Sequence, residues 1–284
     1  MAFIKVKNNQ KYLKAVIFGD AGTGKTTFAQ SVAIGLCQES ENKKVIILDT
    51  EGGIDFFAEH LGEHDIECFV SSDSNMLKDF DSFATEFKNA IAERPHVIII
   101  DSLSYAGGLC EIKYYKNDYY REVKKQWGEK IANPLKMANC HIIVLCRETS
   151  ELKIVNSKPT QNDDIKAKSC FGIDYELNLL INMERLRGEG KQERVAHVLK
   201  DRSFAIDGMS FVNPTFNHIK PHLQGLAKDS EVYLTLKSKI EACKDEGCLE
   251  MLKSELSEIK PKLSQTEIGE LATIFKNKQK EFIK

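Results

Sequence analysis

The chain has 284 residues, of which 42% are hydrophobic, and a formal net charge of −2. This length fits one large globular domain or one domain with a small appendage, and the charge excludes a globally basic nucleic-acid-binding protein. No apolar run approaches the roughly 18 residues of a membrane-spanning helix, and no signal-peptide pattern is found. We therefore expect a soluble cytoplasmic protein without a membrane partner. The eight cysteines show no zinc-binding spacing, so we expect reduced thiols in the core.

A glycine-rich loop follows the first strongly apolar segment, residues 15–18, which predicts a buried strand. The loop is Gly19-Asp20-Ala21-Gly22-Thr23-Gly24-Lys25-Thr26, and a helical pattern runs from Thr27 to Cys37. Strand, loop and helix together fit the phosphate-binding P-loop, whose backbone N–H groups and helix N-terminus bind anions. We expect residues 19–27 to surround the phosphates of ATP, with Lys25 on the β- and γ-phosphates and Thr26 on Mg²⁺.

Two more apolar segments end in acidic residues. Residues 44–48 lead into Asp49-Thr50-Glu51-Gly52-Gly53, and residues 97–100 lead into Asp101-Ser102. In an open α/β sheet, ligands bind at the carboxyl ends of the strands. The second segment fits the Walker B strand, so Asp101 is predicted to hold the metal opposite Thr26.

A segment rich in tyrosine and basic residues lies at 105–126. Four of the eight tyrosines fall within seven residues there, next to several lysines. Aromatic faces and cations together suit single-stranded DNA, because base stacking contributes about 1–3 kcal/mol per base. The alternative is an amphipathic helix that packs some tyrosines inward. The candidate DNA contacts are Lys113, Tyr114, Tyr115, Lys116, Tyr119, Tyr120, Arg121 and Lys124.

The next segments alternate in the same way. A helix is predicted at 127–138 with a kink or a break at Pro134, and a buried strand at 141–146. Residues 149–168 are predicted to form a long loop, and loops of this length are usually functional or disordered; a strand is predicted after it, at 173–183. A hairpin turn at 188–190 and a return strand at 194–199 follow. The candidate DNA contacts of the long loop are Lys153, Lys158, Lys166 and Lys168.

The C-terminal part differs in composition. We expect two domains, a core at 1–222 and a C-terminal helical module at 223–284, because residues 229–283 are rich in Lys and Glu with helical periodicity. Two or three short helices are expected, the last starting at a capping box, Ser264 to Glu267. This module either stabilises the core or binds a single-strand-binding or replication partner.

Residues 12–205 resemble the RecA-type core of P-loop ATPases. The resemblance rests on the P-loop, on the Asp49–Gly53 stretch, on Asp101-Ser102, and on the strand ending in Cys146-Arg147-Glu148. It implies an α/β fold with a mostly parallel central sheet and a small C-terminal helical module. It also implies that Glu51 is the catalytic base, beside Lys25, and that Glu148 lies at the γ-phosphate sensor, where the family often has Gln or His.

Lys200-Asp201-Arg202 is similar to the Lys-x-Arg of hexameric RecA-type helicases, in which these cations reach the neighbouring subunit's nucleotide. The match implies catalytic roles for Lys200 and Arg202 and a homo-oligomeric ring or filament with ATP at subunit interfaces. The closest resemblance is to compact phage-type ATPases of single-strand annealing and recombination, which implies a DNA-stimulated ATPase in a bacterial or phage-infected cell. A helicase or helicase loader, a small-molecule kinase and a non-enzymatic nucleotide-gated scaffold are the alternatives.

Overall fold

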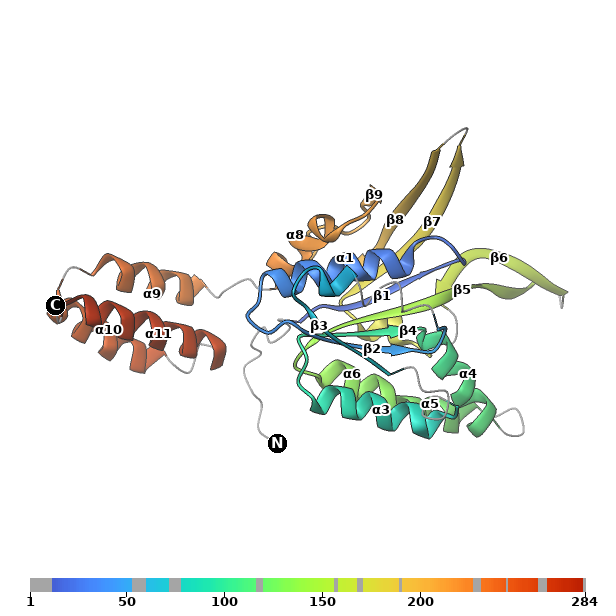
Figure 1. The fold of residues 1–284 in the computed structure, drawn as a ribbon, viewed down its shortest axis with the longest axis horizontal. Helices are drawn as coiled ribbons and strands as arrows, with labels where there is room; N and C mark the ends of the chain where they lie inside the picture. Colours follow the sequence, from blue (N-terminus) through green and yellow to red (C-terminus); the bar gives the residue numbers. More distant parts are fainter. Residues whose placement is uncertain are drawn as a thin grey trace. The chain divides into compact units, whose positions relative to one another are not determined.

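The computed structural model describes residues 12–52, 60–71, 78–115, 120–155, 158–167, 171–188, 191–226, 231–243, 245–259 and 265–282. These residues form two compact units, one from Tyr12 to Gly225 and one from Leu226 onward (Figure 1).

A mostly parallel sheet forms the centre of the first unit, in the order β3-β2-β4-β5-β1-β7-β8-β9, with β6 paired to β5. The pairs from β3 to β7 are parallel, whereas β7–β8, β8–β9 and β5–β6 are antiparallel. The predicted α/β fold is therefore confirmed. The strands are β1 (Lys14–Gly19), β2 (Lys44–Asp49), β3 (Glu67–Ser71), β4 (Val97–Asp101), β5 (His141–Val155), β6 (Lys158–Ala167), β7 (Leu179–Gly188), β8 (Lys191–Asp201) and β9 (Ser210–Val212).

Helices cover both faces of the sheet, with α1 and α8 on one side and α3 to α6 on the other (Figure 1). Successive residues of β1 alternate between the two apolar cores: Ala15 and Ile17 face one, Val16 and Phe18 the other. A strand buried on both faces reads as a continuous apolar run, which is why these strands are visible in the sequence. The helices of this unit are α1 (Lys25–Gln38), α3 (Phe80–Ala92), α4 (Leu103–Tyr114), α5 (Tyr120–Trp127), the π-helix η1 (Gly128–Ala132), α6 (Asn133–Met137), α7 (Ile173–Glu176) and α8 (Phe216–Leu226).

Strand β5 lies between the P-loop strand β1 and the acidic strand β4. Gly19 at the end of β1 is in register with Arg147 of β5, and Asp101 is in register with Leu145 on one side and Asp49 on the other. Because these strands are parallel, the P-loop and the acidic strand ends meet where the strands end, at the carboxyl-terminal edge of the sheet.

Two predicted segments are wrong. Residues 149–168 are predicted as a loop, but the described residues among them, 149–155 and 158–167, belong to a β-hairpin in which β5 runs on to Val155 and β6 returns antiparallel. The strand predicted at 173–183 instead begins with α7, and its pairing starts at Leu179. Near Pro134 the helix changes type and does not break: the π-helix runs directly into α6, with helical dihedrals at Ala132 and Asn133 and proline in the first turn of α6.

The second unit holds three helices in its described residues, α9 (Glu231–Ala242), α10 (Glu246–Ile259) and α11 (Gln265–Phe282). Their apolar side chains form a core of their own, with Tyr233, Leu236 and Leu271 buried. A disulfide joins Cys243 to Cys248, which corrects the expectation that all cysteines are reduced. Five others, at positions 37, 68, 110, 140 and 146, are free thiols. The capping serine of the last helix lies outside the described residues.

None of the helices in the described part of the chain combines the length and apolar character that crossing a bilayer requires.

Candidate active site

The P-loop connects β1 to α1 and has the geometry of an anion-binding loop. Gly22 and Gly24 have φ of +77° and +91°, a region that favours glycine, and the loop curls around the Lys25 side chain. The Lys25 Nζ donates hydrogen bonds to the carbonyl oxygens of Gly19 at 2.9 Å and Asp20 at 2.8 Å. The first turn of α1 carries no acidic residue, so its positive end is available to a phosphate.

Burial lowers the pKa of Lys25, and the nearby Asp101 and Glu51 carboxylates oppose that shift. Its ammonium is thus placed among acids at the strand ends.

Thr26 and Asp101 meet at this edge as predicted for a metal site, with Thr26 Oγ1 donating to Asp101 Oδ2 at 3.1 Å. Burial raises the pKa of Asp101 to about 6, because a charged carboxylate loses hydration there; the Thr26 hydrogen bond opposes this, and Glu51 and Asp49 add to it. Asp49 lies beside Asp101, and its Oδ2 is buried without a hydrogen-bond partner among the described residues.

This donor set of carboxylate and hydroxyl oxygens fits Mg²⁺, which prefers oxygen ligands and is often held by one or two carboxylates plus phosphates. Thr26 and Asp101 would hold the ion, and the unpartnered Asp49 oxygen could accept a hydrogen bond from its water. When bound, Mg²⁺ supplies charge neutralisation on the phosphates. The peptide bond between Asp101 and Ser102 is cis.

Glu51 lies at the end of β2, in a turn that Asp49 holds by accepting hydrogen bonds from the backbone N–H groups of Glu51 and Gly52, both at 2.9 Å. Its Oε1 accepts from Ser102 Oγ at 2.9 Å and from Arg147 Nη2 at 3.0 Å. The carboxylate is therefore fixed by residues from β4 and β5. A glutamate held at this edge can orient or deprotonate water.

Glu148 follows Arg147 on β5 and is half-buried. Burial raises its pKa, as does the charge of Asp20, while Asn182 and Lys25 lower it. The residue thus lies near the P-loop, at the position predicted for a sensor, and its role stays a prediction.

Lys200 and Arg202 lie at the amino-terminal end of the parallel strands, opposite the P-loop. Asp201 between them pairs with Leu179, which in turn is in register with Ala15 near the start of β1. Asp201 is buried and accepts hydrogen bonds from the backbone N–H groups of residues 203 and 206 and contacts His222. Sheet geometry thus places both cations away from the P-loop of their own chain, and the predicted role in trans remains a prediction.

The tyrosine-rich segment divides into two parts. Tyr114 packs edge-to-face on Phe80, and its hydroxyl donates to Asp81, which also binds Lys113. Both side chains thus have partners within the fold. Tyr115 and Tyr120 are 41% and 45% exposed, with ring centroids 4.8 Å apart.

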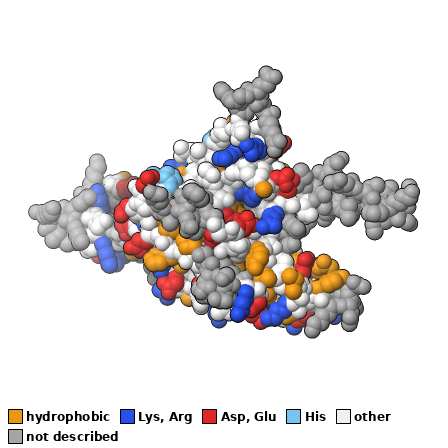
Figure 2. Space-filling view, turned by 45° about the vertical axis from the view of Figure 1, so that its right-hand side comes forward, with side chains coloured by type: hydrophobic (Ala, Val, Ile, Leu, Met, Phe, Trp, Pro, Cys, Tyr) orange, Lys and Arg blue, Asp and Glu red, His pale blue; other side chains and the backbone are white. Residues whose placement is uncertain are grey.

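The other candidate DNA contacts are less defined. Arg121 and Lys124 are exposed on α5. Lys153 belongs to β5, and Lys158 and Lys166 belong to β6, so all three are residues of the β5–β6 hairpin. Lys116, Tyr119 and Lys168 are outside the described residues. Figure 2 shows acidic and basic side chains interspersed on one face of the molecule, so any nucleic-acid contact on that face is a local one.

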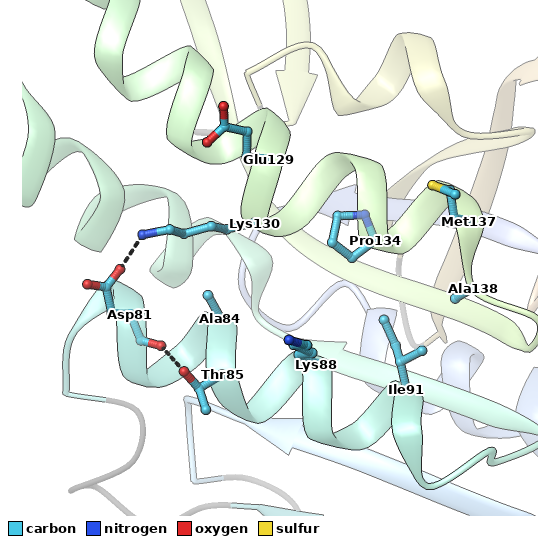
Figure 3. A pocket seen from close by; sticks show the side chains of 10 residues that line it. All are labelled: Asp81, Ala84, Thr85, Lys88, Ile91, Glu129, Lys130, Pro134, Met137 and Ala138. Atoms are coloured by element: carbon cyan, nitrogen blue, oxygen red, sulfur yellow. Dashed lines mark hydrogen bonds and ion pairs between the residues drawn. The ribbon is translucent and has the colours of Figure 1, made fainter.

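Two cavities lie outside the P-loop. One, of about 350 Å³, is on α4 and borders Arg147, with Tyr105 and Ile112 in its wall. The other, of about 560 Å³, lies between α3 and the η1–α6 segment. Figure 3 shows the Lys130–Asp81 ion pair at one end of this groove and Ile91 and Met137 toward the other.

Several residues at the site have contacts that the sequence did not predict. The pairing of Arg147 with Glu51 joins residues 96 positions apart, and only the strand order brings them together. Arg185 and Arg194, on β7 and β8, lie against the glycines of the P-loop. The predicted hairpin indicates only that the two arginines lie near each other, since opposite positions of a hairpin share a face; it does not indicate their contact with the P-loop.

Comparison with protein families gives a match to the AAA domain over residues 11–205. A comparison with curated proteins found no match. The matched segment covers more than half of the chain and contains the P-loop, Glu51, Asp101 and Arg147, which are the residues that the sheet brings to one edge. The chain therefore belongs to the AAA-domain family of P-loop ATPases.

Proposed function

We propose that this chain hydrolyses ATP as a homo-oligomer bound to single-stranded DNA, in the manner of compact phage-type annealing and recombination ATPases. The observation that carries the hydrolytic part is the placement of Glu51. Its carboxylate is held by Ser102 and Arg147 beside a P-loop lysine and a Thr26–Asp101 pair. The carboxylates of Glu51 and Asp101 thus come from neighbouring strands and lie at the same end of the sheet as the P-loop.

The reaction follows from these positions. Water attacks the γ-phosphorus, a new P–O bond forms, and the bond to the β–γ bridging oxygen breaks, so that ADP leaves. Glu51 orients the water and accepts its proton, while Lys25 stabilises charge on the β- and γ-oxygens. Arg147 lies close to the same place, because it is a residue of β5 in register with Gly19 at the start of the P-loop.

Two features support assembly. Lys200 and Arg202 lie at the end of the sheet opposite their own P-loop, so any contact that they make with a nucleotide would have to be with that of a neighbouring subunit. Next to Arg147, α4 exposes Ile112 by 83% and Tyr105 by 40% around a cavity. Exposed apolar side chains grouped in this way are typical of surfaces that a protein partner covers.

The DNA part rests on the Tyr115–Tyr120 pair. Both rings are partly exposed and close together, and Arg121 and Lys124 are exposed on the same helix as Tyr120. Rings and cations in this arrangement suit stacked bases and their phosphates.

The test is ATP turnover with and without a single-stranded oligonucleotide, together with oligonucleotide affinity by fluorescence anisotropy. Alanine at both Tyr115 and Tyr120 should weaken the affinity roughly 10-fold or more, since stacking contributes about 1–3 kcal/mol per base. Phe69→Ala, at an exposed aromatic residue on the edge strand β3, is the matched control. Turnover that ignores DNA, or an unchanged affinity in the double variant, would refute the DNA assignment. Electron microscopy with ATP reports assembly, and duplex unwinding would favour the helicase alternative.

A further inference from the structure

The β7–β8 hairpin extends beyond the strand that carries the P-loop. Strand β1 ends at Gly19, opposite Met183, whereas β7 continues to Gly188 and β8 returns from Lys191 (Figure 1). The approach is close, because a Cβ added to Gly19 would lie 2.2 Å from the carbonyl oxygen of Met183. The P-loop therefore turns beside the extended part of the hairpin.

Two arginines of this hairpin contact the loop. Arg185 and Arg194 are directly opposite each other in the β7–β8 register. A Cβ on Gly24 would lie 2.5 Å from Cδ and 2.8 Å from Nε of Arg194, and a Cβ on Gly22 would lie 3.6 Å from Nη1 of Arg185. Both side chains thus lie against loop glycines that have no side chain to keep them away.

The charges around the loop make this arrangement unusual. Like charges directly opposite on neighbouring strands repel each other, and an anion between the two arginines and the loop would remove that cost. The rest of the site is acidic, with Asp20, Glu51 and Asp101 close enough to affect Lys25. A bound triphosphate adds further negative charge, whereas Arg147 is already paired with Glu51.

Strand order decides which phosphates the arginines can reach. Glu51, Asp101 and Arg147 belong to β2, β4 and β5, on one side of β1, and the hairpin lies on the other side. Hydrolysis has to occur on the side of Glu51, so the γ-phosphate points there. The hairpin side faces the remainder of the nucleotide.

We propose that Arg185 and Arg194 bind the α- and β-phosphates of the nucleotide on their own chain. Guanidinium groups match phosphate oxygens with two parallel hydrogen bonds, which the point charge of a lysine does not reproduce. This inference rests on the nucleotide binding proposed above. It adds that the two arginines determine affinity for ATP and ADP alike and act without a neighbouring subunit.

The experiment measures the affinity of a slowly hydrolysed ATP analogue and of ADP by isothermal titration calorimetry, at a concentration where light scattering finds monomers. Arg194→Ala and Arg185→Ala should each weaken both ligands by a similar factor, about 10- to 100-fold, as expected for loss of charge-assisted hydrogen bonds. Arg194→Lys should recover part of the loss. The control is Arg94→Gln. It removes an exposed arginine that precedes β4, at the amino-terminal ends of the strands and away from the P-loop, and should change neither affinity.

The outcomes separate the two proposals. If the wild-type chain binds neither ligand, the proposed function fails. If it binds both and the alanine variants, still folded by circular dichroism, bind them equally well, only the arginine assignment fails. A loss confined to the ATP analogue would place the arginines on the γ-phosphate, and a loss seen only in oligomers would place them on a neighbour's nucleotide. Either result would overturn the inference.

Discussion

Glu51→Gln is the substitution that tests the catalytic assignment most directly. Glutamine keeps the length of the side chain and an oxygen that can accept the hydrogen bonds of Ser102 and Arg147, at 2.9 and 3.0 Å in the wild-type chain. It cannot accept a proton from water. The variant should therefore bind ATP with nearly normal affinity and hydrolyse it slowly.

The size of the effect can be estimated in two parts. Loss of a positioned general base costs about 10²- to 10⁴-fold in rate, or about 3–5 kcal/mol in the activation free energy. The effect on folding is much smaller, because the Glu51–Arg147 ion pair is largely exposed, at 39% and 63% of the two side chains. Exposed pairs contribute at most about 1 kcal/mol, so lost turnover would not reflect lost structure.

Phosphate release measures turnover, and titration with a fluorescent ATP analogue measures binding. Glu67→Gln is the matched control, since this exposed glutamate begins β3 at the amino ends of the strands. Both variants should unfold within a few degrees of the wild-type temperature. Undiminished hydrolysis by Glu51→Gln would show that another group activates the water, and the assignment would have to be withdrawn.

Three other results are expected. Without Mg²⁺, the free energy of unfolding should fall by up to about 3 kcal/mol between about pH 4 and pH 6, because folding raises the pKa of Asp101 from 3.8 to about 6 and the folded state holds the proton more tightly. Urea titrations of Asp101→Asn should lack that fall. Gly35→Ala should destabilise the ATPase unit by about 1–3 kcal/mol, since the new Cβ would lie 2.0 Å from Cγ of Phe216; an unchanged melting temperature would contradict this packing. Reduction of Cys243–Cys248 should destabilise the second unit by about 2 kcal/mol in urea, and replacing both cysteines with serine should make reductant irrelevant.

The central strands could be predicted from the sequence because of their surroundings. Segments 15–18, 45–48, 97–100 and 142–146 are buried on both faces and therefore continuously apolar. The P-loop pattern then fixed which end of the sheet binds phosphate, and the α/β fold followed. These features are local in the chain, so a single sequence is sufficient to find them.

The features that were missed depend on strand pairing, register and strand order, which leave little trace in the local sequence. The part of β5 that pairs with β6, from Glu148 onward, and β6 itself have no long run of apolar residues, and their backbone hydrogen bonds leave no periodic signal in the sequence. In the same way, nothing near Arg147 or Arg194 in the sequence indicates contact with Glu51 or Gly24. Those contacts arise from strand order and register, which are properties of the whole sheet.

The strand order has a thermodynamic consequence. With β5 inserted between β1 and β4, the residues that face a nucleotide come from segments separated by whole crossover units, so no short fragment of the ATPase unit contains the complete site. Such non-local contacts form late in folding and dissolve together when the sheet unfolds. A ligand at this edge therefore binds only the native state, and at a concentration 100 times its dissociation constant it should add about 2.7 kcal/mol to the stability of the entire ATPase unit.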